Sequence, residues 1–213
     1  MDPALPEAAE HYFSERPRSI SHRRELRFLY RGQLLSFQVD AGVFASHGLD
    51  PGTALLIESF QLGLSDRVLD LGCGWGALGV AAARAAPTGH IVMTDVNRRA
   101  VLLSRRNLRR NGIANAEVRP GSGFAPVAGE RFDAILTNPP YHVGRPFLLE
   151  LLAKVPEYLN DGGTLWIVGK GSQGIRFYQE WLAEHWAPLV EVAGRRSGYR
   201  ALAARPGPDS LQR

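Results

Sequence analysis

The segment from residue 68 to residue 87 constrains the fold more than any other part of the chain. A largely apolar run at 68–71 and an Ala-rich stretch at 77–86, which Pro87 ends, flank alternating glycines at Gly72, Gly74 and Gly76. The apolar run predicts a buried strand and the Ala-rich stretch a helix, so the glycines form a tight strand-to-helix turn. A strand, a turn and a helix in this order are the repeating unit of a parallel α/β sheet.

Strand and helix patterns continue to alternate after this turn. Further strands are predicted at 91–94, at Val118, at 132–137 and at 164–168, helices at 97–111, 147–159 and 175–186, and a closing antiparallel hairpin at 189–192 and 199–203. We therefore expect an α/β fold with a doubly wound, mostly parallel, seven-stranded Rossmann-like sheet and helices on both faces. Ligands bind such sheets beyond the carboxyl ends of the strands.

The first fifty residues are expected to form an extension of this domain. Residues 27–30 and 34–37 flank Arg31-Gly32-Gln33 and predict a β-hairpin. A helix is expected after Asp50, with Pro51 in its first turn. We expect the extension at 1–50, the main domain at 51–205 and a disordered tail at 206–213.

Composition narrows the compartment and the partners. The chain has 213 residues, 45% of them hydrophobic, a single cysteine and a net charge of +4. It shows neither a signal-peptide pattern nor an apolar run near the roughly 20 residues that span a bilayer. We expect a cytoplasmic protein without a membrane partner. The histidines and Cys73 show no metal-ligand spacing, so no metal is expected, and the positive charge favours a polyanionic partner.

The glycine turn fits two classes of nucleoside cofactor. Gly74, Gly76 and Gly79 match the dinucleotide pattern G-x-G-x-x-G, and Asp95 follows at about the 20-residue spacing of a ribose-binding acid. Read from Asp70, the same segment is D-x-G-x-G-x-G, a pattern typical of S-adenosylmethionine-binding turns. Within the turn, Cys73 is expected to fill space rather than to act as a nucleophile, because no histidine accompanies it.

The tetrapeptide Asn138-Pro139-Pro140-Tyr141 favours S-adenosylmethionine, because it is suited to holding a planar –NH2 group. The prolines stiffen the backbone and lack N–H donors, which would leave carbonyl groups free to accept. The Asn138 side-chain oxygen and the Pro139 carbonyl would accept from the two amine hydrogens and stabilise positive charge that develops on the nitrogen. Tyr141 would stack on the flat substrate.

Arginines cluster in two places. The helix predicted at 97–111 carries Arg98, Arg99, Arg105, Arg106, Arg109 and Arg110, which are either a solvated face or a phosphate-binding strip. The better candidate for RNA contact is the N-terminal run with interleaved aromatic residues, Arg16, Arg18, Arg23, Arg24, Arg27 and Arg31. We weigh contact and solvation equally there.

Together these residues resemble the small-domain class I methyltransferases that form N2-methylguanosine in small-subunit ribosomal RNA. The similarity extends from His11-Tyr12-Phe13-Ser14-Glu15-Arg16-Pro17 to Gly198-Tyr199-Arg200. It includes Ala41-Gly42-Val43-Phe44-Ala45, Asp50-x-Gly52-Thr53-x-Leu55-Leu56 and Asn107-x-x-x-Asn111-Gly112. Some members have two methyltransferase-like domains and only one is matched here, so RNA contact is expected from the N-terminal extension.

The resemblance implies S-adenosylmethionine as cofactor and ribosomal RNA, or the small-subunit ribosomal particle, as partner. The implied cofactor-binding residues are Asp70, Gly72, Cys73, Gly74, Gly76, Asp95, Val96, Ser122, Gly123, Asn138, Phe44 and Thr53. Asp95 would hold the ribose, Ser122 would lie near the adenine, and Phe44 and Thr53 would approach the methionine end or the substrate. Asn138, Pro139, Pro140 and Tyr141 are implied for catalysis, and Arg16, Arg18, Arg23, Arg24, Tyr141 and His142 for substrate binding.

Other functions remain open from the sequence. DNA adenine or cytosine amino-methyltransferases and protein-glutamine methyltransferases share Asn-Pro-Pro-Tyr, although a glutamine enzyme would have a helical N-terminal domain instead of a hairpin. An NAD-dependent oxidoreductase would use the same glycines but needs a proton-relay residue that we cannot place. A non-catalytic RNA-binding module would need neither Asn138 nor Asp95.

Overall fold

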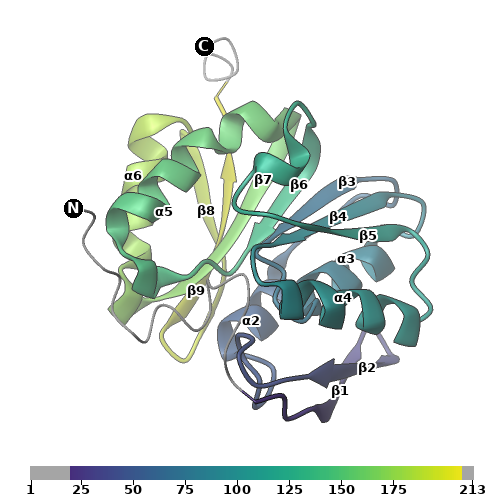
Figure 1. Cartoon of the computed structure of the whole chain (residues 1–213). Helices are drawn as coiled ribbons and strands as arrows, with labels where there is room; N and C mark the ends of the chain where they lie inside the picture. The colour runs from purple at the N-terminus through teal and green to yellow at the C-terminus, as the bar shows by residue number, and fades with distance from the viewer. Residues whose placement is uncertain (1–19, 208–213) are drawn as a thin grey trace.

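The computed structural model describes residues 20–207, which form two β-sheets and the helices that cover them (Figure 1). The main sheet has seven strands in the order β5-β4-β3-β6-β7-β9-β8. Their bounds are β3 (Arg67–Leu71), β4 (His90–Asp95), β5 (Ala116–Pro120), β6 (Phe132–Thr137), β7 (Leu159–Lys170), β8 (Leu189–Arg196) and β9 (Tyr199–Arg205). Strands β5, β4, β3, β6 and β7 are parallel, and β9 is antiparallel to both of its neighbours. The predicted fold class is thereby confirmed.

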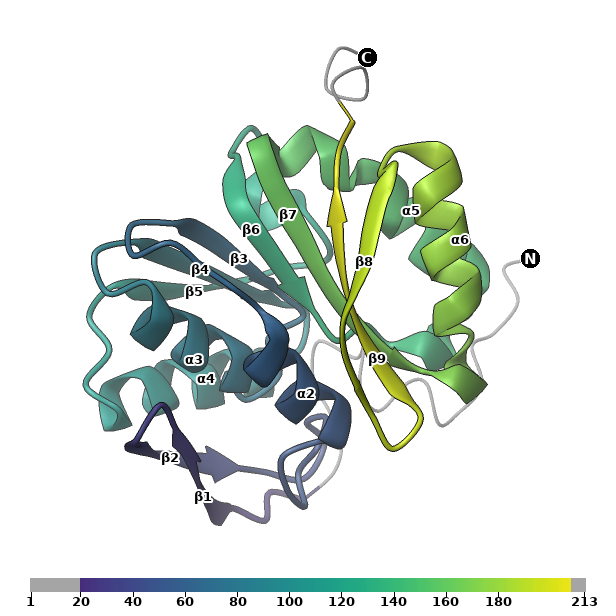
Figure 2. The same cartoon turned by 180° about the vertical axis from the view of Figure 1, so that it is seen from behind.

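Helices cover both faces of this sheet (Figure 2). They are α2 (Pro51–Ser59), α3 (Ala77–Ala85), α4 (Arg98–Arg110), α5 (Arg145–Lys154) and α6 (Ile175–His185), with short 3-10 turns η1 (Ala125–Val127), η2 (Tyr141–Val143), η3 (Val155–Tyr158) and η4 (Gly171–Gln173). Alternate strand residues point to opposite faces. Val68 belongs to the core under α2, α3 and α4, whereas Leu69 and Leu71 belong to the core under α5 and α6. No helix among the described residues is long and apolar enough to cross a membrane.

The smaller sheet is the predicted N-terminal hairpin, formed by β1 (Arg24–Tyr30) and β2 (Gln33–Val39). Two buried Asn side chains of α4 hold it. Asn107 Oδ1 accepts from the Gln38 N–H at 2.8 Å, and its Nδ2 donates to the Gln38 carbonyl at 2.9 Å. Asn111 pairs with Ser36 in the same way, at 2.9 and 2.7 Å. The two amides thus complete the edge of β2 as a neighbouring strand would.

Two adjoining predicted boundaries, the end of α5 and the start of β7, are wrong. The helix expected at 147–159 ends as α5 at Lys154, η3 follows, and β7 begins at Leu159 instead of residue 164. Pro156 explains the early end, because proline lacks the N–H that an α-helix needs and its ring clashes with the preceding turn. The early strand start was hidden by Asp161-Gly162-Gly163, a sequence typical of turns, which coincides with an irregular register between β6 and β7.

Candidate active site

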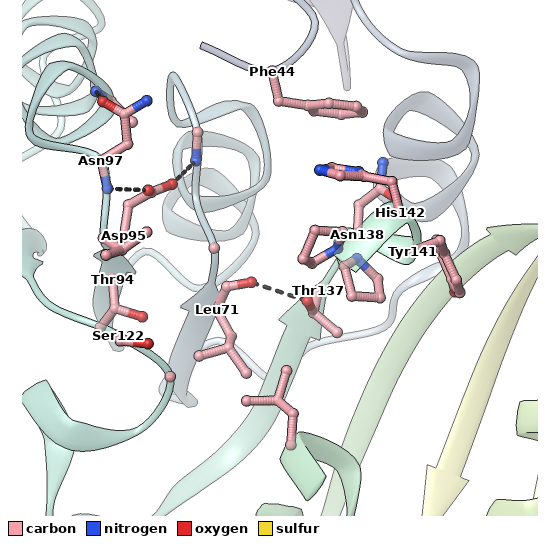
Figure 3. A pocket seen from close by; sticks show the side chains of 18 of the residues that line it. Phe44, Leu71, Thr94, Asp95, Asn97, Ser122, Thr137, Asn138, Tyr141 and His142 are labelled. Carbon is pink, nitrogen blue, oxygen red and sulfur yellow. Dashed lines mark hydrogen bonds between the residues drawn. The ribbon is translucent and has the colours of Figure 1, made fainter. Parts of the chain in front are cut away.

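An open cavity lies at the carboxyl ends of β3, β4 and β6 (Figure 3). Strands β3 and β6 are neighbours, and the chain leaves them in opposite directions along the sheet, so the cavity occupies the switch point that binds ligands in such folds. The sequence-predicted residues that line the cavity are Phe44, Gly72, Gly74, Asp95, Val96, Ser122, Gly123, Asn138, Pro139, Pro140, Tyr141 and His142.

The glycine turn gives the cavity a bare backbone wall. Gly72 and Gly74 have φ angles of 79° and 56°, which disfavour any residue with a Cβ. A Cβ at either position would meet nothing within 4 Å, so the space beside the turn is open. Gly76 (φ 94°) lies just before α3 and outside the cavity wall, where a Cβ would come within 3.0 Å of Met93 and Ser104. This cradle fits the nucleoside of a cofactor.

Asp70 lies beneath the turn instead of in the cavity wall. It is fully buried, and its Oδ2 accepts from the Gly79 N–H in the first turn of α3 at 2.8 Å. Burial raises its pKa to about 7, while that hydrogen bond opposes the shift. Asp70 therefore holds the start of α3 and shapes the turn from below.

Asp95, at the end of β4, joins the turn to the next helix. Its Oδ2 accepts from the Gly74 N–H and its Oδ1 from the Asn97 N–H, both at 2.8 Å. Each carboxylate oxygen keeps a further lone pair that can accept a hydroxyl. Burial raises the pKa of Asp95 to about 6, so the carboxylate is ionised at neutral pH. An ionised acceptor on the cavity wall is suited to a ribose diol.

The orientation of the Asn138 amide follows from its partners. Its Nδ2 lies 2.9 Å from Asp50 Oδ2 and 2.9 Å from Thr53 Oγ1. A carboxylate oxygen only accepts hydrogen bonds, so the –NH2 end of the amide must face Asp50. Asp50 also caps α2, accepting from the Thr53 N–H at 2.8 Å. Both amide hydrogens are thereby engaged, which leaves Asn138 Oδ1 as an acceptor at the cavity wall.

The proline carbonyl groups are less free than the sequence suggested. The Pro139 carbonyl accepts from the Tyr141 N–H and the Pro140 carbonyl from the Val143 N–H, both at 3.0 Å. The expectation of unengaged carbonyl groups is therefore corrected. A carbonyl oxygen has two lone pairs, so Pro139 can still accept one more hydrogen bond.

Tyr141 is anchored by its hydroxyl. The hydroxyl donates to the Val168 carbonyl at 2.8 Å, and the ring packs against Tyr178 at a centroid distance of 5.7 Å. A Cβ at Gly169 would lie 2.3 Å from that hydroxyl, so glycine is required there. Burial raises the pKa of Tyr141 far above its ordinary value, which excludes it as a base. Tyr141 is a fixed side of the cavity.

Phe44 and His142 carry the more accessible rings. Phe44 is 45% exposed and lies above Asn138 and His142 (Figure 3). Burial lowers the pKa of His142, so its imidazole is neutral at pH 7. On the opposite side, Ser122 and Gly123 follow β5 and border the space near Asp95. The cavity therefore has a polar end at Asp95 and a ring-lined end at Asn138.

Comparison with known proteins decides the class of this site. The family model of the methyltransferase small domain matches residues 34–203. The chain belongs to the methyltransferase small domain family. This membership confirms the class I methyltransferase resemblance and S-adenosylmethionine as the cofactor, and it decides against the oxidoreductase interpretation of the glycine turn.

Two relatives are similar to the chain over different shares of their length. Uncharacterized protein YbxB of Bacillus subtilis (strain 168) is 36% identical over 199 residues, which cover 92% of this chain and 98% of that protein. Ribosomal RNA small subunit methyltransferase C of Escherichia coli (strain SMS-3-5 / SECEC) is 38% identical over 170 residues, which cover 77% of this chain and 48% of that protein. The chain thus spans about half the length of this second relative.

The fold is also similar to a solved structure, the T. thermophilus 16S rRNA N2 G1207 methyltransferase (RsmC) in complex with AdoMet and guanosine. The TM-score is 0.76 at 27% identity, and the match covers 90% of this chain and 52% of that one. Homology to this group of rRNA methyltransferases agrees with the resemblance found in the sequence.

Two predicted cofactor residues, Thr53 and Cys73, line a smaller adjoining hollow instead of the main cavity. Thr53 is engaged with Asn138. Cys73 is buried, its thiol lies 3.5 Å from the Ser104 hydroxyl, and burial raises its pKa well above the ordinary value. A buried protonated thiol is inert. The space-filling interpretation of Cys73 therefore agrees with its surroundings.

Of the predicted substrate-binding arginines, the two that the structure describes, Arg23 and Arg24, do not line the cavity. Arg16 and Arg18 lie outside the described residues, and Arg23 and Arg24 are exposed at the start of β1. On α4, Arg105 donates to the Val118 carbonyl at 2.8 Å, and Arg110 pairs with Glu25 at 2.6 Å. These two α4 arginines thus hold neighbouring elements.

Asp50 is the positioning residue that sequence reasoning missed. Its N-cap pattern before Pro51 was visible, but its partner Asn138 is 88 residues away. Tyr199, at the start of β9, and Gln173, in η4, also line the cavity and were not predicted.

Proposed function

We propose that this methyltransferase transfers a methyl group to the exocyclic N2 amine of a guanine in small-subunit ribosomal RNA. The observation that carries the proposal is the fixed amide of Asn138, whose –NH2 end is held by Asp50 and Thr53. Homology to rRNA guanine-N2 methyltransferases supports the choice of guanine and of RNA.

The residues of the cavity would divide the work between its two ends. Gly72, Gly74 and Asp95 would hold the nucleoside of the cofactor, with Val96, Ser122 and Gly123 around its base. When bound, S-adenosylmethionine supplies an electrophilic methyl group. Asp70 and Gly76 would support the turn from behind, and Thr53 would act through Asn138.

Asn138 would orient the amine of the guanine. An exocyclic amine delocalises its lone pair into the ring and is a weak nucleophile. Hydrogen bonds to Asn138 Oδ1 and to the Pro139 carbonyl would fix both amine hydrogens, direct the lone pair at the methyl carbon and stabilise the positive charge that forms on nitrogen. The guanine nitrogen would accept the methyl group that S-adenosylmethionine supplies, with the electrons of the broken C–S bond left on sulfur, and would then release its proton to solvent.

The flat base would lie against the rings of this end. Pro140 and Tyr141 form a rigid floor, because the Tyr141 hydroxyl is bound to the Val168 carbonyl. Phe44 and neutral His142 are positioned to cover the other side. Flat surfaces of this kind stabilise a bound base by stacking.

A protein glutamine or a DNA adenine or cytosine would offer Asn138 a similar –NH2 group. Incubation with labelled cofactor and separate pools of rRNA, DNA and protein, followed by nucleoside mass spectrometry, distinguishes these substrates. We expect N2-methylguanosine in small-subunit rRNA, obtained either naked or as a particle. Label confined to protein or to N6-methyladenine would overturn the proposal, and Asn138→Ala serves as the inactive control.

A further inference from the structure

We propose that a basic rim beside the cavity, formed by Lys170, Arg176, Arg195 and Arg200, binds the phosphates of the RNA strand that carries the target base. The inference rests on the proposed function. It concerns residues other than the predicted N-terminal arginines, and it places the strand on the β7–β9–β8 side of the cavity mouth.

Sheet register brings the two strand arginines of the rim together, and helix α6 adds Arg176. Arg195 on β8 and Arg200 on β9 are directly opposite each other, and Arg200 is in turn opposite Gly169 on β7. Paired residues of adjacent strands point to the same face, and on this face Arg200 donates to Gln179 Oε1 of α6 at 3.3 Å. Arg176 lies on the first turn of the same helix.

In the described part of the chain, the four cations of the rim form no salt bridge. No acidic side chain forms a salt bridge with Lys170, Arg176, Arg195 or Arg200 within residues 20–207, although Arg196 and Arg205 of the same strands pair with Glu58 and Glu191. Like charges directly opposite on adjacent strands destabilise a sheet. Partial desolvation and the nearby Arg176 and Arg195 lower the pKa of Arg200. A fold that tolerates this repulsion has a cationic surface suited to an anion.

The rim is continuous with the cavity. Tyr199 lines the cavity, and Lys170, its register partner on β7, has its Nζ 5.7 Å from the centre of the Tyr199 ring. Arg200, the next residue of β9, points to the opposite face of the sheet, toward α6. Gln173, also in the cavity wall, lies between Lys170 and Arg176 in the chain. A strand whose base enters the cavity would therefore extend its backbone over these cations.

A nucleic acid fits this surface better than other polyanions. Single-stranded nucleic acids are bound by cations that follow the backbone and by rings on which bases stack. The cavity mouth adds exposed rings to the cations, since Phe44 is 45% and Phe147 36% exposed. Arginine, which supplies most of the rim, pairs with phosphate through its planar guanidinium.

Binding of a labelled single-stranded RNA oligonucleotide, measured by fluorescence anisotropy at several salt concentrations, tests the rim. The double variant Arg195→Gln/Arg200→Gln should reduce the slope of log K against log salt by about 1.4, because each phosphate contact on a single strand contributes about 0.7. The matched control is Arg106→Gln/Arg109→Gln on α4, which lies away from α6 in both Figures 1 and 2 and should retain the wild-type slope.

A wild-type salt slope in the rim variant, or an equal reduction of the slope in the α4 control, would overturn the proposal that the rim binds RNA. Calorimetric cofactor affinity and circular dichroism of both variants report whether the fold is intact. Binding to phosphatidylglycerol vesicles with no RNA binding would assign the rim to a membrane surface and also reject the proposal. If rRNA is methylated but the rim variant keeps the wild-type salt slope, the rim is rejected and the proposed function is not. If the rim variant reduces the salt slope of RNA binding but rRNA is not methylated, the proposed function is rejected and the rim is not.

Discussion

The Nδ2 atom of Asn138 lies 2.9 Å from the Oδ2 atom of Asp50, a residue at the start of α2. Thr53 accepts from the same amide nitrogen, and its own N–H donates to Asp50. The capping carboxylate of one helix therefore fixes which end of the Asn138 amide faces the cavity. We therefore propose Asp50 as a determinant of methyl transfer that acts only through Asn138.

Replacing Asp50 by Ser should lower kcat by at least tenfold with little change in cofactor affinity. Serine retains a good N-cap for α2, but its side chain is too short to hold the Asn138 amide. Asp50→Asn keeps an oxygen for both hydrogen bonds and should retain most of the activity. Steady-state kinetics and calorimetry measure the two effects. Equal activity of the Ser variant and the wild type would remove Asp50 from this role.

Asn138→Ala should reduce kcat by about 100-fold or more, the usual loss when a preorganised transition-state acceptor or donor is removed. Cofactor affinity should change little, because Asp95 and the glycine turn lie at the other end of the cavity. Single-turnover assays with saturating cofactor separate the two quantities. A parallel loss of cofactor binding would mean that Asn138 supports the cofactor instead of the amine.

Cofactor affinity should fall as the pH is lowered through about 6, the pKa of Asp95. Below this pH the carboxyl is protonated, so cofactor binding must release a proton, and log K should decrease by up to about 1 for each pH unit. In Asp95→Asn the affinity should be weaker by about 1–3 kcal/mol and independent of pH in this range. Calorimetry between pH 5 and 8 is the measurement. A wild-type profile that is flat would show that Asp95 does not contact the cofactor.

Asn111→Ala should destabilise the protein by about 1–3 kcal/mol, because it leaves the Ser36 N–H and carbonyl without their partners. Asn107→Ala should cost at least as much, since Asn107 also donates to the Trp75 carbonyl at 2.7 Å. Urea denaturation gives the free energies of unfolding, and limited proteolysis should show cleavage within the hairpin first. The neighbouring Arg109→Ala variant is the control. Unchanged urea midpoints would indicate that other contacts hold the hairpin.

Local patterns in the sequence were sufficient for most of the fold. The glycine turn, the capped helix after Asp50 and the N-terminal hairpin all depend on residues close in the chain, and each appears where it was predicted. The end of α5 was missed because the apolar side-chain pattern continues past Pro156. The pattern does not show that the proline interrupts the backbone hydrogen bonds of the helix.

Relationships between distant segments were not visible in the sequence. The i, i+4 spacing of Asn107 and Asn111 puts both on one helical face, but nothing in the spacing identifies the edge of β2 as their partner. The four cations of the proposed basic rim lie on four separate elements, β7, α6, β8 and β9, so the more conspicuous arginines of α4 attracted the functional hypothesis. Sequence placed Asn138 at the site, but only the fold supplies the Asp50 carboxylate that orients it.

The segment that leads from the hairpin into the cavity is bound at both ends of helix α4. Near its end Asn107 and Asn111 hold β2, and before its first turn Asn97 Nδ2 donates to the Gly42 carbonyl at 2.9 Å while its N–H donates to Asp95. Asp95 and the loop that carries Phe44 thus share one rigid support. A substitution that tilts this helix should change the affinity for the cofactor and the affinity for the methyl acceptor together. Selection on one of these affinities therefore constrains the other.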